Sequence, residues 1–148
     1  MPLPAFNQDG DLPEGVHLAS FAEVVARFGG GSEQRREVMA RLDRIRQLAS
    51  TTGLLDRLIV FGSFITAKTE PNDVDVVLVM KDDFDPLGCP AECQPLFDHR
   101  RAAGELGASC FWIRPGMLFG EPTDTFVAGW GARREGGRRG IVEVRDDP

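Results

Sequence analysis

The sequence contains no long hydrophobic run. No stretch approaches the roughly 20 consecutive apolar residues that a membrane-spanning helix requires. The first six residues carry neither the basic group nor the apolar stretch of a secretory signal. We therefore expect a cytoplasmic protein with no membrane partner.

Metal-binding and disulfide-forming residues are also scarce. The three cysteines, Cys89, Cys93 and Cys110, are an odd number, which suits a reducing compartment better than a disulfide framework. Cys89 and Cys93 have the spacing of half a zinc site, but no second Cys/His pair with ligand spacing follows, which argues against structural zinc. We expect His17 in a turn and His99 on a helix surface.

Positive charge is in deficit, because 17 Lys and Arg residues face 23 Asp and Glu residues and the net charge is −6. Binding along DNA depends on clustered Lys and Arg that contact phosphates, so this balance argues against an extensive DNA-binding surface. A single bound nucleotide remains compatible with it, because Mg²⁺ would bring the positive charge.

One dense basic cluster interrupts the acidic background: Arg133, Arg134, Arg138 and Arg139 flank Gly136-Gly137. Two interpretations remain open. The arginines form a solvated loop whose charges repel, or they contact an anion, either the triphosphate of a nucleotide or an acidic partner. Trp130, just before the cluster, has three candidate roles: stacking on a base, packing on a partner, or packing in the core.

Length and composition indicate one compact domain. A chain of 148 residues with 42% hydrophobic and 27% charged residues can bury about two thirds of its unfolded surface around one core. Residues 1–18 begin with a stretch rich in Pro, Gly and Asp, which predicts an extended N-terminal arm. Residues 19–148 are then a single domain.

Hydrophobic periodicity and capping residues predict a mixed architecture. Ser20 caps a short helix over 19–27, and Ser32 caps a longer one that ends near Gly53. In the longer helix the apolar positions form the core side, and the solvated side is expected to contain arginines 35, 36, 41, 44 and 46. The other expected elements are strands over 58–61, 73–80 and 109–114, a helix over 93–106, and a hairpin of strands 125–130 and 140–145.

The strand that begins at Asp73 should be central, because it is apolar on both faces after its acids. The predicted class is therefore α/β (α+β), a small mixed sheet with helices packed on it.

Two acids at the start of this strand indicate a metal site. Asp73 and Asp75 are two residues apart, so their side chains share one face at a separation of about 6.5–7 Å. Two carboxylates this close repel unless a cation lies between them. Mg²⁺ is commonly held by carboxylates together with the phosphates of a substrate.

A second motif precedes the acids and suits phosphate. Gly62 lets backbone amides approach a ligand with no Cβ in the way. A helix that begins at Ser63 would direct unpaired N–H groups at an anion, and the hydroxyl adds a donor. The alternative interpretation is a tight strand-to-helix turn with a capping serine, and the two are compatible.

Together these motifs resemble the nucleotidyltransferase superfamily of the DNA polymerase β type. Its pattern is a hydrophobic residue and Gly-Ser, about ten residues, then Asp-hydrophobic-Asp-hydrophobic. Here Phe61-Gly62-Ser63 is followed by nine residues and then by Asp73-Val74-Asp75-Val76. The extended motif resembles a minimal bacterial branch of that superfamily.

The resemblance implies a minimal nucleotidyltransferase fold and transfer of a nucleoside monophosphate from a nucleoside triphosphate with Mg²⁺ or Mn²⁺. It assigns Asp73 and Asp75 to the metal and to catalysis, and Gly62 and Ser63 to the phosphates. Lys68, in the loop between the motifs, either adds a positive charge to the phosphates or is an ordinary exposed lysine. The implied acceptor is a partner protein, RNA held by a partner, or a small molecule in a homodimer cleft. A role in a toxin–antitoxin pair is the setting that the resemblance favours.

The chain departs from the superfamily at the third carboxylate, which active members carry on a neighbouring strand. The corresponding position here is Ser109, or Cys110 if the register differs by one. Acids that could substitute from elsewhere are Asp98, Glu105 and Glu143. The departure leaves an alternative function, a degenerate member that binds a nucleotide or a protein without chemistry.

Overall fold

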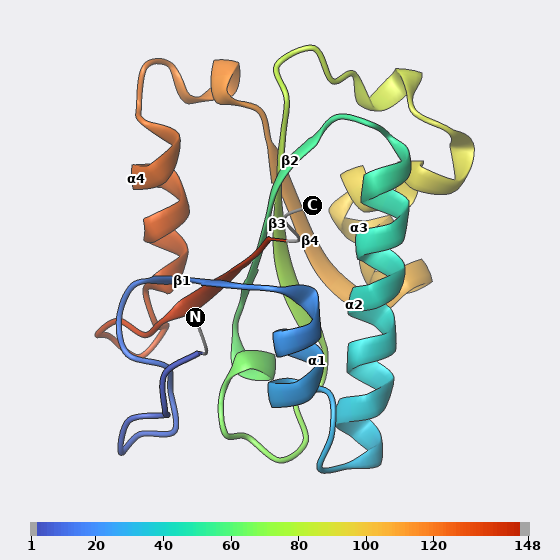
Figure 1. Cartoon of the computed structure of the whole chain (residues 1–148). Coiled ribbons are helices and arrows are strands. Elements are labelled where there is room, and N and C mark those ends of the chain that lie inside the picture. Colours follow the sequence, from blue (N-terminus) through green and yellow to red (C-terminus); the bar gives the residue numbers. More distant parts are fainter. Residues whose placement is uncertain (1–2, 146–148) are drawn as a thin grey trace.

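The computed structural model describes residues 3–145 and contains a five-stranded mixed sheet in the order β1-β5-β2-β3-β4 (Figure 1). The pairs β1–β5 and β3–β4 are parallel, and β2 is antiparallel to both β3 and β5. The strands are β1 (Val16–Ala19), β2 (Leu55–Phe61), β3 (Val74–Met80), β4 (Ala108–Ile113) and β5 (Ile141–Val144). The helices are α1 (Phe21–Phe28), α2 (Glu33–Thr51), α3 (His99–Arg101) and α4 (Thr123–Ala128). The predicted α/β class is confirmed.

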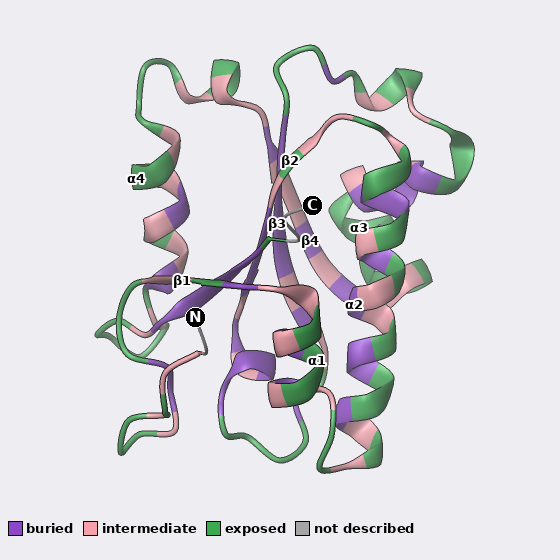
Figure 2. Ribbon diagram, viewed as in Figure 1, coloured by how far each residue is buried: buried purple, intermediate pink, exposed green. Residues whose placement is uncertain are grey.

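Helices cover the two faces of the sheet unequally (Figure 1). The helices α1 and α2 and the 91–106 segment lie on one side, and α4 lies on the other. The side of α2 that faces the sheet is buried, and its other side is exposed (Figure 2). Because α4 is short, it covers only part of its face, and the candidate site described below lies there.

The expected helix starts follow from local hydrogen bonds. The Ser20 hydroxyl accepts from the Glu23 amide at 3.1 Å, and the Glu23 carboxylate accepts from the Ser20 amide at 3.3 Å, which is a complete capping box. The Ser32 hydroxyl accepts from the Arg35 amide at 3.1 Å and begins α2. Strand β3 is central as expected, since Val74 and every residue from Val76 to Met80 are buried.

Two predicted elements are wrong. The 125–130 strand is instead the helix α4 and a 3-10 turn, Gly129–Gly131. Phe126, Val127 and Trp130 share one side of this helical segment, where Val127 is buried and the two rings pack on the core. The expected hairpin partner, β5, is paired with β1 on one side and with β2 on the other, so it has no free edge for the 125–130 segment.

The 93–106 helix is also wrong, because it is divided into a 3-10 segment (Ala91–Phe97), α3 and one π turn (Ala102–Leu106). Pro95, which has no N–H, lies inside the first of these pieces, and Asp98, with the extended angles φ −132° and ψ 110°, separates that piece from α3.

The expected arm of residues 1–18 is largely integrated into the domain. Val16–Ala19 form β1, so residues 16–18 belong to the sheet. Leu12 is fully buried, and its carbonyl accepts from the Gly140 amide at 2.8 Å. The burial of Leu12 and the pairing of β1 with β5 therefore hold residues 12–19 against the rest of the domain. Residues 1–2 of the expected arm and 146–148 of the expected domain lie outside the described residues.

Within residues 3–145, the helices are all too short or too polar to cross a bilayer.

Candidate functional site

The two sequence motifs meet where β2 ends and β3 begins. Phe61, the last residue of β2, pairs with Asp75 near the start of β3. Because the two strands are antiparallel, Gly62 and Ser63 follow β2 directly beside the acids. They border a cavity of about 680 Å³, which Lys68, Asp75 and Ser109 also line. The structure thus gathers most of the predicted site residues around one space.

Gly62 lies in direct contact with Asp75. Its φ of +83° belongs to a region that glycine adopts readily and other residues rarely do. A Cβ built on Gly62 would overlap the Asp75 carboxylate oxygen Oδ2. The glycine is therefore required both by its backbone conformation and by the approach of the acid.

The ionised form of Asp75 is destabilised by burial and by the neighbouring Asp73 carboxylate. Burial raises the pKa of Asp75 to about 6, and the nearby Asp73 carboxylate contributes to this rise. The Ser109 hydroxyl, Arg134 and Arg139 oppose it. Ser109 Oγ also donates to Asp73 Oδ2 at 3.3 Å, so this hydroxyl lies beside both carboxylates. A divalent cation would relieve the repulsion, and two carboxylates with substrate phosphates are a donor set that suits one Mg²⁺.

The destabilised ionised form of Asp75 predicts how pH affects the stability of the protein. A carboxyl whose folded pKa exceeds its unfolded value is destabilising once ionised, so the penalty is full above pH 6 and absent below about pH 4. We expect Asp75→Asn to raise the free energy of unfolding by about 1 kcal/mol at pH 8, allowing for solvent screening. The gain should shrink to nothing as the pH falls through this window.

Urea unfolding of the wild type and of Asp75→Asn at pH 8, 6 and 4.5 would measure this difference. The exposed Asp83, replaced by Asn, is the matched control. A pH-independent gain in Asp75→Asn would contradict the assignment to ionisation.

Arg35 holds the loop between the two motifs, and its predicted exposure is wrong. Its side chain is buried, and it donates to the backbone carbonyls of Phe28, Phe64, Thr66 and Lys68 at 2.5–3.1 Å. The loop that bears Lys68 is therefore shaped by one guanidinium from α2. The signal was present in the sequence, since Arg35 lies seven residues before the buried Leu42 and on the same helix face.

Arg41 makes a similar contact at the starts of β3 and β4. Its Nη1 donates to the carbonyls of Asn72 at 3.2 Å and Gly107 at 3.3 Å. These residues directly precede Asp73 and the strand that carries Ser109. Arg41 therefore braces the two strand starts, whereas Arg36 and Arg44 are exposed as predicted and Arg46 is half-buried.

Ser109 pairs with Asp75 across β3 and β4. Cys110 is buried and points to the opposite face, so Ser109 is the residue beside the acids. The position where a third carboxylate was expected therefore holds a hydroxyl.

The three acids that could have replaced it are engaged elsewhere. Glu143 is buried opposite Ile59 and accepts from Arg57 at 2.7 Å and from Arg145 at 2.9 Å. Asp98 caps α3, and Glu105 pairs with Arg101 at 2.8 Å. Between residues 3 and 145, no three His, Cys, Asp or Glu side chains gather in a way that could hold a metal ion.

The basic cluster is largely neutralised by the N-terminal segment. Arg133 and Arg139 pair with the buried Asp11 at 3.0 and 3.6 Å, and Arg138 approaches Glu14 at 3.6 Å. Arg134 forms no hydrogen bond or ion pair with any residue in the described part of the chain, and both Arg134 and Arg139 line the cavity. The structure therefore brings two of the four predicted arginines to the site.

Four rings in the cavity lining were not predicted as a group. Phe61, His99, Phe111 and Trp130 all line it. His99 is exposed as expected, but it stacks on Phe111 instead of standing alone on a helix surface. The sequence signal was modest: Phe61 precedes Gly62, and Phe111 follows Ser109 by two residues and so shares its face.

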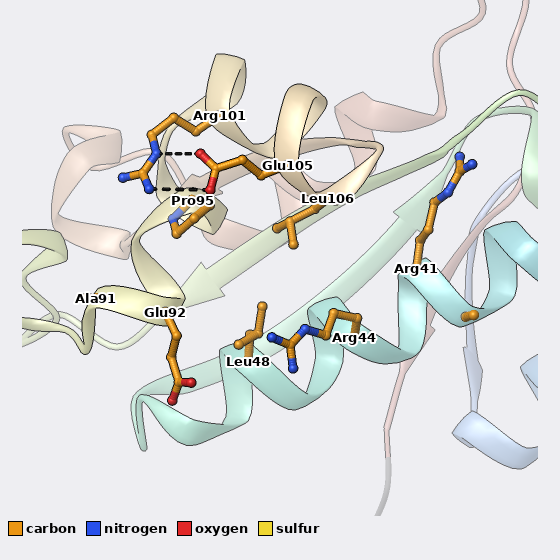
Figure 3. A pocket seen from close by; sticks show the side chains of 10 residues that line it. Arg41, Arg44, Leu48, Ala91, Glu92, Pro95, Arg101, Glu105 and Leu106 are labelled. Atoms are coloured by element: carbon orange, nitrogen blue, oxygen red, sulfur yellow. Dashed lines mark hydrogen bonds and ion pairs between the residues drawn. The ribbon is translucent and has the colours of Figure 1, made fainter.

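A second hollow lies on the opposite side of the sheet, between α2 and the 91–106 segment (Figure 3). Its volume is about 510 Å³, and it is bordered by Arg41, Arg44 and the Arg101–Glu105 ion pair. None of the Gly-Ser or Asp-x-Asp residues reaches it. Gly62, Ser63, Asp75 and the two cavity arginines therefore favour the 680 Å³ cavity as the candidate site, although Asp73 is not among the residues that line it.

A family described as "Family of unknown function (DUF6932)" matches residues 4–145, nearly the whole chain. No curated protein and no solved structure matches the chain.

Proposed function

We propose that this chain, which belongs to the DUF6932 family of unknown function, is a Mg²⁺-dependent nucleotidyltransferase. The observation that carries the proposal is the contact between Gly62 and Asp75, which line the same cavity. A phosphate-binding turn and a metal-binding acid pair are useful together only if one ligand touches both. A nucleoside triphosphate carrying Mg²⁺ is such a ligand.

Each residue of the site would have a distinct role in binding the cation or the phosphates. Asp73 and Asp75 would hold the cation, and the backbone at Gly62 with the Ser63 hydroxyl would bind phosphate oxygens. Lys68 and Arg134 would add positive charge at the edge of the cavity. When bound, Mg²⁺ or Mn²⁺ supplies neutralisation of the charge that develops on the phosphates. Catalysis would then depend mainly on holding the phosphates and an acceptor oxygen in line.

A second candidate function is binding of the nucleotide without transfer. It is favoured by Ser109, which occupies the position opposite Asp75. A hydroxyl is a weaker Mg²⁺ ligand than a carboxylate and a poor proton acceptor at neutral pH. The present residues therefore suit one cation better than two.

The test is incubation of the protein with labelled nucleoside triphosphates, Mg²⁺ or Mn²⁺, and a cell lysate that supplies the acceptor. We expect transfer of label that Asp75→Ala abolishes and that Asp83→Ala, a change at an exposed acid, leaves intact. In calorimetry, Asp73→Asn combined with Asp75→Asn should abolish binding of the Mg²⁺–nucleotide complex. Unchanged affinity in that double variant would remove the acids from the site.

A carboxylate introduced opposite Asp75 should increase the affinity of the site for Mg²⁺. We expect Ser109→Asp to tighten Mg²⁺ binding about tenfold or more, because a third carboxylate adds a ligand and a charge. Titration of the metal by calorimetry would measure this gain, and the labelling assay would show whether transfer rises with it. Ser109→Asn, which has a similar shape without the charge, is the control. Equal metal affinity in the two variants would show that the position does not reach the cation.

A further inference from the structure

Three aromatic rings form one wall of the cavity that contains Gly62 and Asp75. Phe61 and Phe111 come from β2 and β4, and Trp130 comes from the turn after α4; all three are half-buried. We infer that this aromatic wall of Phe61, Phe111 and Trp130 is a nucleobase subsite that holds the base by stacking. The inference rests on the proposed function, since it assigns a place to the base of the same nucleotide.

Trp130 is held in one orientation by its neighbours. Its ring centroid lies 4.7 Å from that of Phe61 and 4.9 Å from that of Phe111, with interplanar angles of 41° and 38°. Phe126 of α4 meets it edge-on at 6.1 Å. A ring that is already fixed loses little conformational freedom when a ligand stacks on it. The wall is therefore preorganised for a flat ligand.

The wall directly adjoins the proposed phosphate-binding turn. Phe61 directly precedes Gly62 and pairs with Asp75. Phe111 lies two residues after Ser109 on β4, so their side chains share one face. A nucleotide with its phosphates at Gly62 and Asp75 would thus extend its base along the same face toward the rings. The cavity volume of about 680 Å³ falls within the range of typical small-molecule sites.

These three rings pack against the core and at the same time border the cavity. Ile59 and Val77 lie farther along the same sheet face, and both are aliphatic and fully buried. The aromatic residues occur where the face opens into the cavity, and they remain half-buried there. Aromatic side chains that border a hollow instead of filling it are typical of ligand sites.

The polar groups at the edge of the wall predict weak discrimination between bases. His99 stacks on Phe111 at 4.7 Å and 28°, and both His99 and Glu135 line the cavity while remaining exposed. Exposed groups exchange their hydrogen bonds with water and contribute little specificity, whereas stacking accepts any base. We expect purines to bind more tightly than pyrimidines because of their larger ring area, with adenine and guanine nearly equal.

The two tryptophans of the chain allow a direct test. Trp112 packs against Phe84 and Phe97 on the other face of β4, so Trp112→Phe leaves Trp130 as the single fluorescent indole. In this variant Mg²⁺–ATP and Mg²⁺–GTP should quench the fluorescence, and Mg²⁺–tripolyphosphate should not. In calorimetry on the wild type, the two purine nucleotides should bind about 5- to 100-fold more tightly than tripolyphosphate.

Replacement of the indole then locates the base. Trp130→Leu should bring the affinity for Mg²⁺–ATP close to that for Mg²⁺–tripolyphosphate, and Trp130→Phe should keep part of the difference. Equal affinities in the wild type, or an unchanged difference in Trp130→Leu, would overturn the subsite and leave the proposed function standing.

Failure of every ligand to bind the wild type would instead overturn the proposed function, and the subsite with it. If Trp130→Leu does not fold, the fluorescence titration decides, because nucleotide binding without a change at Trp130 would overturn the subsite.

Discussion

Replacement of Arg35 with methionine is expected to be the most destabilising single change in the part of the chain that carries the site. The side chain is buried and donates to four backbone carbonyls of the α1 end and the 64–68 loop. Methionine keeps much of the volume but leaves those acceptors without a donor. Because each unsatisfied buried group costs about 1–3 kcal/mol and the loop can relax toward water, we expect a loss of about 3 kcal/mol.

Urea unfolding would measure this loss, with Arg36→Met as the control. Arg36 is the next residue of α2 and is exposed, so its replacement should change the free energy of unfolding by less than about 0.5 kcal/mol. Similar losses in the two variants would show that the hydrogen bonds of the buried Arg35 contribute little to stability. We also expect Arg35→Met to weaken binding of the Mg²⁺–nucleotide complex, because the loop that bears Lys68 would lose its shape.

The second large effect is expected at Gly62. An alanine there would have to adopt φ +83° and ψ −165°, which is strained for any residue with a Cβ and costs about 1–3 kcal/mol. The methyl group would also overlap Asp75 Oδ2, so the carboxylate would have to turn away from its place in the cavity. We expect Gly62→Ala to weaken Mg²⁺–nucleotide binding by more than about tenfold, measured by calorimetry.

A combined variant separates the two causes. In an Asp75→Ala background the overlap disappears and the backbone strain remains, so Gly62→Ala should cost less stability there than in the wild type. Gly30→Ala is the control, because Gly30 has no positive φ and no atom close to an added Cβ. Retention of full nucleotide affinity in Gly62→Ala would mean that the position of Asp75 does not matter for the ligand.

Several features of the site could be predicted from the sequence because they depend on neighbours in the chain. The capping serines begin both N-terminal helices through hydrogen bonds between residues three positions apart. The i, i+2 spacing places Asp73 and Asp75 on one face of an extended segment whatever surrounds it. The Gly-Ser motif between two apolar strands predicts a turn that lies near the acids. The antiparallel pairing of β2 with β3 places the turn there.

Other features could not be predicted, since contacts between distant segments decided them. The apolar spacing in residues 125–130 is compatible with a strand or a helix, and β1 and β2 occupy both edges of β5, the strand with which it was expected to pair. Asp11 lies more than 120 positions from Arg133, with which it pairs. No local pattern indicates such a partner, and so nothing in the sequence indicated that the arginines of the basic cluster form ion pairs with the N-terminal segment.

The sequence by itself therefore determined the mixed α/β class, the two N-terminal helices, the central strand and the pairing of a glycine turn with two acids. Each follows from periodicity or capping within a few residues. Only the tertiary structure decided that Arg35 is buried under the loop, that Ser109 lies opposite Asp75, and that Phe61, Phe111 and Trp130 border one cavity. The physical reason is that these arrangements depend on sheet register and on packing between segments about 20 to 70 residues apart, which local preferences do not encode.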